Sequence, residues 1–129
     1  MFRADVTLLR REGGIYRIGL DTGRKELWLP VSATLLGTYD RVESMVASDD
    51  GRLAVLGLCH DVRGPASVGV AVYDLATRKR LFAGRFCGGR ASCSAPQVVA
   101  GADGHFAFAY RDDSAREHVL THYRMPRFP

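Results

Sequence analysis

Three consecutive residues, Cys59, His60 and Asp61, have the side-chain types that a nucleophile, its base and an orienting group require. They end an apolar run, however, and neighbours on a strand point to opposite faces, so Cys59 and His60 would not meet on an extended chain. The sequence therefore favours a buried cysteine at a strand end, followed by a polar loop. That loop also contains Arg63, and we take His60, Asp61 and Arg63 as candidate binding residues.

His118 and His122 form a second candidate pair, four residues apart. On a helix this spacing places two imidazoles on one face, where they can bind a metal ion. Residues 117–124 instead alternate in character as a strand does, and positions four apart on a strand are about 13 Å apart. We therefore expect both histidines at a surface or an interface, and we expect neither a metal site nor a cofactor.

The three cysteines lack Cys-x-x-Cys spacing, and their odd number excludes a fully paired disulfide framework. Cys59 lies in an apolar run and is expected to be buried. Cys87 and Cys93 flank a Gly/Ser loop and leave two alternatives. They form a disulfide in an oxidising compartment, or they are free thiols in a cytoplasmic protein.

The densest positive charge surrounds Phe82 and Phe86, and it comprises Arg78, Lys79, Arg80, Arg85 and Arg90. Arginines beside aromatic rings can bind phosphates and stack on bases. The alternative is an edge strand whose phenylalanines enter the core while its arginines face water and discourage unwanted pairing. Nucleic-acid contact through residues 78–90 is therefore the weaker of the two interpretations.

The composition is that of a soluble globular domain: 129 residues, 47% hydrophobic and 25% charged, with a net charge of +4. Acidic residues are interspersed with the arginines, so no long stripe of one sign forms. No GxSxG, HExxH or P-loop pattern occurs, and no catalytic residue is predicted. No apolar run approaches the roughly 18 residues of a membrane helix, and no signal peptide is recognisable. We expect a cytoplasmic protein without a membrane anchor.

The elements that must position these residues are short. Helix signals are weak, whereas runs of β-branched and aromatic residues alternate with Gly, Asp and Pro turns. The pattern predicts an all-β, antiparallel fold of about ten short strands, at residues 4–10, 15–20, 26–29, 41–47, 52–59, 68–73, 80–85, 97–100, 105–111 and 117–124.

A repeat runs through these strands. Residues 49–55 (DDGRLAV) match residues 102–108 (ADGHFAF), 53 positions later. Residues 41–85 contain four strands, a Ser-Asp-Asp-Gly turn, and a strand ending in Val-Tyr-Asp before Leu-Ala-Thr-Arg-Lys-Arg-Leu. This segment resembles bacterial WD40-like and YVTN-type β-propeller repeats, although Arg78 stands where that family has glycine. Residues 20–27 resemble the end of a preceding blade, and residues 95–124 resemble the start of a following one.

The resemblance implies one all-β domain, 1–129, with blade-like units at about 1–30, 41–86 and 95–124; a compact β-sandwich or barrel is the alternative. Closed propellers use 4 to 8 blades, more than this chain supplies. We therefore expect a non-catalytic protein-binding or assembly module, which completes a propeller by oligomerisation or with a partner subunit. The alternative is a subunit of a propeller-type enzyme whose site forms across subunits.

Overall fold

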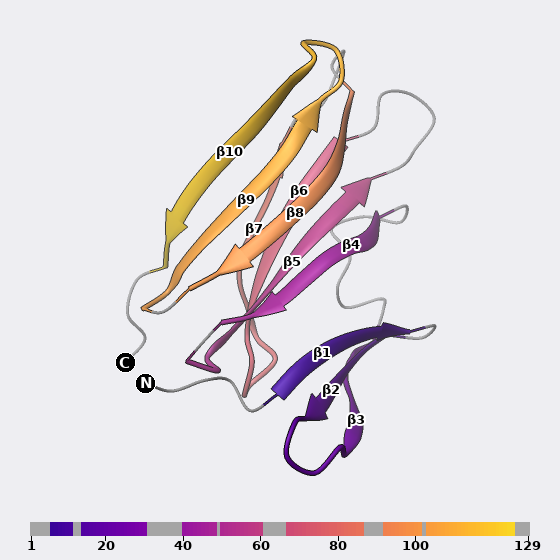
Figure 1. The fold of residues 1–129 in the computed structure, drawn as a ribbon, viewed down its shortest axis with the longest axis vertical. Coiled ribbons are helices and arrows are strands. Elements are labelled where there is room, and N and C mark those ends of the chain that lie inside the picture. The colour runs from indigo at the N-terminus through magenta and orange to yellow at the C-terminus, as the bar shows by residue number, and fades with distance from the viewer. Residues whose placement is uncertain are drawn as a thin grey trace.

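The computed structural model describes residues 6–11, 14–30, 40–48, 50–60, 67–86, 92–101 and 103–125. These residues form ten antiparallel strands and no helix, which confirms the all-β prediction (Figure 1). Sheet A contains β1 (Val6–Arg11), β2 (Gly14–Gly19) and β3 (Lys25–Pro30). Sheet B contains β4 (Asp40–Ala47), β5 (Leu53–His60), β6 (Ser67–Asp74) and β7 (Arg80–Phe86). Sheet C contains β8 (Cys93–Ala100), β9 (His105–Asp112) and β10 (Glu117–Arg124).

Sheet B is the middle layer of the molecule. On one side β4 contacts β1 of sheet A, and on the other β4, β5 and β6 contact β8 of sheet C (Figure 1). Residues 53–59 of β5 and 67–73 of β6 are consequently buried without interruption. A strand covered on both faces needs apolar side chains on both, so these two strands read as continuous apolar runs instead of alternating.

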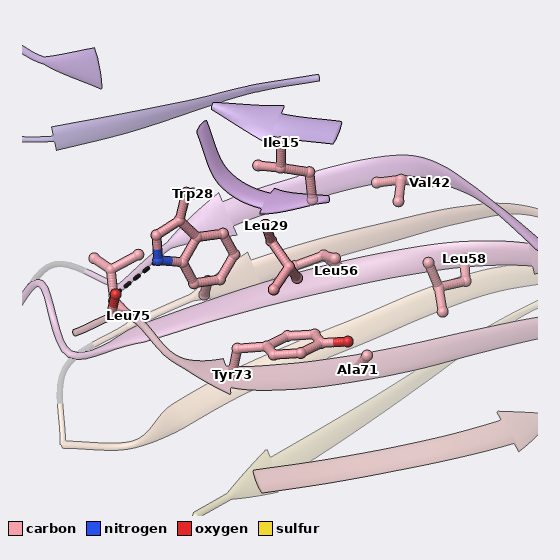
Figure 2. Packing of buried hydrophobic residues seen from close by; sticks show 10 residues of the cluster. Ile15, Trp28, Leu29, Val42, Leu56, Leu58, Ala71, Tyr73 and Leu75 are labelled. Carbon is pink, nitrogen blue, oxygen red and sulfur yellow. Dashed lines mark hydrogen bonds between the residues drawn. The ribbon is translucent and has the colours of Figure 1, made fainter. Parts of the chain in front are cut away.

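The core between sheets A and B is built around Trp28, which is 1% exposed. Its indole Nε1 donates a buried hydrogen bond of 2.7 Å to the carbonyl oxygen of Leu75, and its ring meets Tyr73 edge-on (Figure 2). Ile15 and Leu29 lie beside it and face the side chains of sheet B (Figure 2). The single tryptophan of the chain thus fastens sheet A to the β6–β7 turn.

The core between sheets B and C is aromatic. Phe82 and Phe86 of β7 pack against rings of sheet C, with Phe86 and Phe108 centroids 5.2 Å apart and Phe82 and Tyr123 centroids 5.7 Å apart. Aromatic pairs at these separations contribute about 0.5–1.5 kcal/mol beyond the area they bury. Each phenylalanine of β7 therefore belongs to the core, whereas Arg80 and Arg85 of the same strand are exposed.

The first strand of sheet C begins earlier than the sequence indicated, at Cys93 and not Gln97. A register shift between Ser94 and Gln97, with Ala95 at φ 55°, absorbs Pro96 within β8. Proline is tolerated at such bulges because it has no N–H to place in the ladder. The Ser44 hydroxyl donates to the Pro96 carbonyl at 2.9 Å, which ties β8 to β4.

Two turns of sheets A and B have the same backbone conformation. Gly23 donates its N–H to the Gly19 carbonyl at 2.8 Å, and Arg78 donates to the Asp74 carbonyl at 2.9 Å. The φ angles of Gly23 and Arg78 are 67° and 66°. Strands β2 and β3 therefore correspond to β6 and β7.

The first hairpins of sheets B and C correspond as well, but their turns differ in length. Ser48 N–H bonds to the Leu53 carbonyl across four residues, whereas Gly101 N–H bonds to the His105 carbonyl across three. The position of Leu53 is therefore taken by His105, and not by Phe106 as the 53-residue spacing implies. Because side chains alternate along a strand, this one-residue difference exchanges the two faces of β9.

Candidate functional site

The outer face of sheet C is the most distinctive surface of the described chain. We define it as the outward side chains of three strands: Gln97, Val99, His105, Ala107, Ala109, Arg111, His118, Leu120, His122 and Arg124. Phe106 and Phe108 alternate with these residues and are buried against sheet B. Val99 is 66% exposed and Leu120 is 73% exposed, which leaves an apolar centre open to solvent.

Three of the four histidines of the chain lie on this face. By register, His105, His118 and His122 correspond to Leu53, Val68 and Val72 of sheet B, all of which are at most 1% exposed. The covered face of sheet B is thus apolar, whereas the matching uncovered face of sheet C is rimmed by imidazoles and arginines.

His105 and His122 come together on this face. The Nδ1 atom of His105 lies 3.1 Å from Nε2 of His122, and the rings stack with centroids 5.0 Å apart. Because Ala107 is opposite His122 in the ladder, the two histidines are diagonal neighbours across β9 and β10. The sequence singled out His118 with His122 and missed His105. Antiparallel pairing of the alternating runs 105–111 and 117–124 is the signal that would have revealed it.

Sheet A has an outer face of its own. Tyr16, Ile18 and Leu27 share that face, and Leu27 is 45% exposed. By the turn correspondence, Tyr16 and Ile18 occupy the positions of Ala71 and Tyr73, which on sheet B pack against sheet A. Both ends of the three-layer stack therefore present apolar side chains.

The basic segment follows the edge-strand alternative. Arg78, Lys79, Arg80 and Arg85 are exposed in the β6–β7 turn and on β7, while the phenylalanines between them are core residues. Phe82 and Phe86 are partly buried against the core between sheets B and C, on the same strand as the exposed Arg80 and Arg85. Arg90 lies outside the described residues. Nucleic-acid binding by the exposed arginines remains a prediction, which retention on heparin that is lost at modest salt would support.

The candidates that follow Cys59 are only partly described. Cys59 is buried, as predicted, and forms no disulfide; its Sγ accepts a hydrogen bond of 3.8 Å from Nη2 of Arg41. His60 is half-buried at the end of β5, whereas Asp61 and Arg63 lie outside the described residues. Within the described ranges, no three His, Cys, Asp or Glu side chains are close enough to hold a metal together.

Cys93 is disulfide-bonded, so the free-thiol alternative is wrong for this residue. It is fully buried in the core between sheets B and C. Cys87, the other cysteine of the predicted loop, lies outside the described residues.

A shallow pocket of about 460 Å³ opens where β4 and β8 run side by side. Its lining includes Glu43, Ser44 and Gln97. Glu43 pairs with Arg41, and Ser44 donates to the Pro96 carbonyl, so both side chains serve the local structure. Among the described residues that line the pocket there is no histidine or cysteine.

Two tyrosines of the cores have perturbed acidity. Burial raises the pKa of Tyr73, and the nearby Arg80 guanidinium partly opposes this effect. Burial also raises the pKa of Tyr123. Desolvation disfavours the phenolate, so both side chains behave as core groups.

No family model and no curated protein sequence matches the chain. Across the described residues, no helix is both long and apolar enough to cross a membrane.

Proposed function

We propose that the chain is a non-catalytic assembly module, which closes a propeller-like ring by joining the outer face of sheet C to the outer face of sheet A on another copy. The observation that carries this proposal is the placement of exposed apolar side chains. Among the described residues, Leu20, Leu27, Val99 and Leu120 are the large apolar side chains left exposed, and all four belong to the two end sheets or their turns.

The proposed contact continues one that already exists inside the chain. Sheet B packs on sheet C through the face that is equivalent, strand by strand, to the outer face of sheet C. Sheet B packs on sheet A through its other face, which is equivalent to the outer face of sheet A. The same two equivalent faces therefore meet at the contact between sheets A and B and at the contact between sheets B and C. Repeating this contact once more places sheet C of one copy against sheet A of the next copy.

The geometry of repeats favours two copies. A head-to-tail contact uses different surfaces on the two partners, and it either closes into a ring or grows into a filament. Two chains would supply six sheets, within the 4 to 8 blades of closed propellers. Burial of a leucine side chain contributes about 1.5–3 kcal/mol, so Leu27 and Leu120 would be important in each contact.

Mixing two single variants tests this arrangement. Leu27→Asp damages the sheet A face and Leu120→Asp damages the sheet C face, so each variant alone should show the 14.2 kDa monomer mass by light scattering. An equimolar mixture should recover a species of twice that mass, because one of its two contacts then has both natural faces. Ala83→Asp, an exposed change on sheet B, serves as the control and should associate like the natural chain.

Other outcomes overturn the proposal in separable ways. A natural chain that stays monomeric at high concentration refutes self-assembly. A dimer broken by only one of the two leucine variants shows that like faces meet, which retains an assembly function but refutes ring closure.

A further inference from the structure

We infer that His105 and His122 form a binding site for a divalent transition-metal ion of the Cu²⁺, Ni²⁺ and Zn²⁺ class. Two imidazole nitrogens from adjacent strands lie 3.1 Å apart on an exposed face. The inference goes beyond the proposed assembly, which would cover the same face of sheet C, so the site is also tested in the Leu27→Asp chain, whose outer face of sheet C stays open.

The separation of the nitrogens matches a chelating pair. With metal–nitrogen bonds of about 2.0–2.1 Å, a nitrogen–nitrogen distance of 3.1 Å corresponds to an angle of roughly 100° at the metal. That value lies between the right angle of square-planar or octahedral coordination and the tetrahedral angle. To bind the ion, each ring must turn by roughly 40° so that its lone pair points at the metal and not at the other nitrogen. Water would complete the coordination.

The protonation of the two imidazoles is also compatible with metal binding. The hydrogen bond between the rings requires a proton on one of the two facing nitrogens, and a metal ion must displace it. In the bound form His105 would carry its proton on Nε2 and His122 on Nδ1.

The surroundings select the class of metal. Arg124 is opposite His105 in the ladder, and carboxylate side chains are missing from the outer face of sheet C as defined above. A hard cation such as Ca²⁺ or Mg²⁺ needs several oxygen ligands, which this face does not provide. Imidazole suits Cu²⁺, Ni²⁺ and Zn²⁺, and Cu²⁺ should bind most tightly.

A copper titration of the full chain at pH 7.5 tests the inference. Electron paramagnetic resonance should show nitrogen coupling from two imidazoles, with one ion bound per chain. His105→Ala and His122→Ala should each lower the affinity by about tenfold or more, because half of the protein ligands are lost. His118→Ala is the matched control: it is on the same strand and face as His122 but about 13 Å away, and should leave the affinity unchanged.

The result that would overturn the inference is equally direct. Copper affinity that is unaffected by His105→Ala and His122→Ala, or lowered to the same extent by His118→Ala, excludes a chelating pair. Repeating the titration in Leu27→Asp, a change at the opposite end of the stack, separates the two proposals. Metal binding should persist there even though assembly is lost.

Discussion

Arg78 occupies a backbone position that suits glycine. Its φ of 66° matches the 67° of Gly23 at the corresponding turn, and a Cβ added to Gly23 would meet no atom within 4 Å. A side chain in this left-handed conformation costs roughly 1–2 kcal/mol, partly offset by the greater backbone entropy that glycine loses on folding. Arg78 therefore adds a local strain to a turn whose backbone conformation matches that of the turn at Gly23.

Arg78→Gly should raise the free energy of unfolding by about 0.5–1 kcal/mol, because it removes that strain. Gly23→Ala is the reverse change, because it introduces a side chain at the equivalent left-handed position, and it should lower the free energy of unfolding by a similar amount. Urea denaturation followed by circular dichroism measures both. A neutral or destabilising Arg78→Gly would mean that the arginine side chain has a compensating contact.

Tyr73 predicts a loss of stability in alkali. Its folded pKa is raised by burial, so the unfolded chain releases the phenolic proton first as the pH rises. The stabilising contribution is complete below about pH 10 and is lost as the pH rises through the folded pKa. Tyr73→Phe should show a smaller fall in unfolding free energy between pH 9 and 11 than the natural chain does. Equal falls in the two proteins would refute this origin.

At the scale of elements, hydrogen-bonded turns and apolar alternation determine most of the architecture. Asp50 accepts N–H of Arg52, and Asp74 accepts N–H of Ala76 and Thr77, as expected of aspartates in tight turns. These local signals explain why strand positions such as 117–124 were predictable. The pairing of His105 with His122 was not, because it depends on the register between two strands.

The register of β9 gives a direct test. Ala54 and Ala107 match in the sequence repeat, yet Ala54 is fully buried and Ala107 is half-exposed on the outer face of sheet C. Ala54→Asp should cost about 3 kcal/mol or more, because it buries a charge. Ala107→Asp should cost under about 1 kcal/mol. Urea denaturation in the Leu27→Asp background excludes any contribution from association, and equal losses would contradict the one-residue offset.

At the scale of the whole molecule, the three sheets contain unequal numbers of strands. Among the described strands, sheet A corresponds to the last three strands of sheet B, and sheet C corresponds to its first three. By this correspondence β1 is equivalent to β5, and the free edge of β1 is equivalent to the edge of β5 that pairs with β4. Likewise β10 is equivalent to β6, and the free edge of β10 is equivalent to the edge of β6 that pairs with β7. Composition and strand count could not show this, because it depends on which hairpins correspond.

Association through the end sheets should make thermal stability depend on concentration. Anything that binds the folded chain and not the unfolded one stabilises it by mass action. The Tm of the natural chain should therefore rise with protein concentration, whereas that of Leu120→Asp should not. Differential scanning calorimetry over a hundredfold range measures the effect, and a constant Tm for both proteins would contradict association.

The shorter turn before β9 has a consequence for how such a chain can change during evolution. Point substitutions that convert one face of a strand from apolar to polar require several independent mutations, most of them destabilising on their own. Loss of a single codon in a hairpin loop can present the opposite set of side chains to solvent in one event. Duplicated modules can thus gain new surfaces while their sequences still look alike.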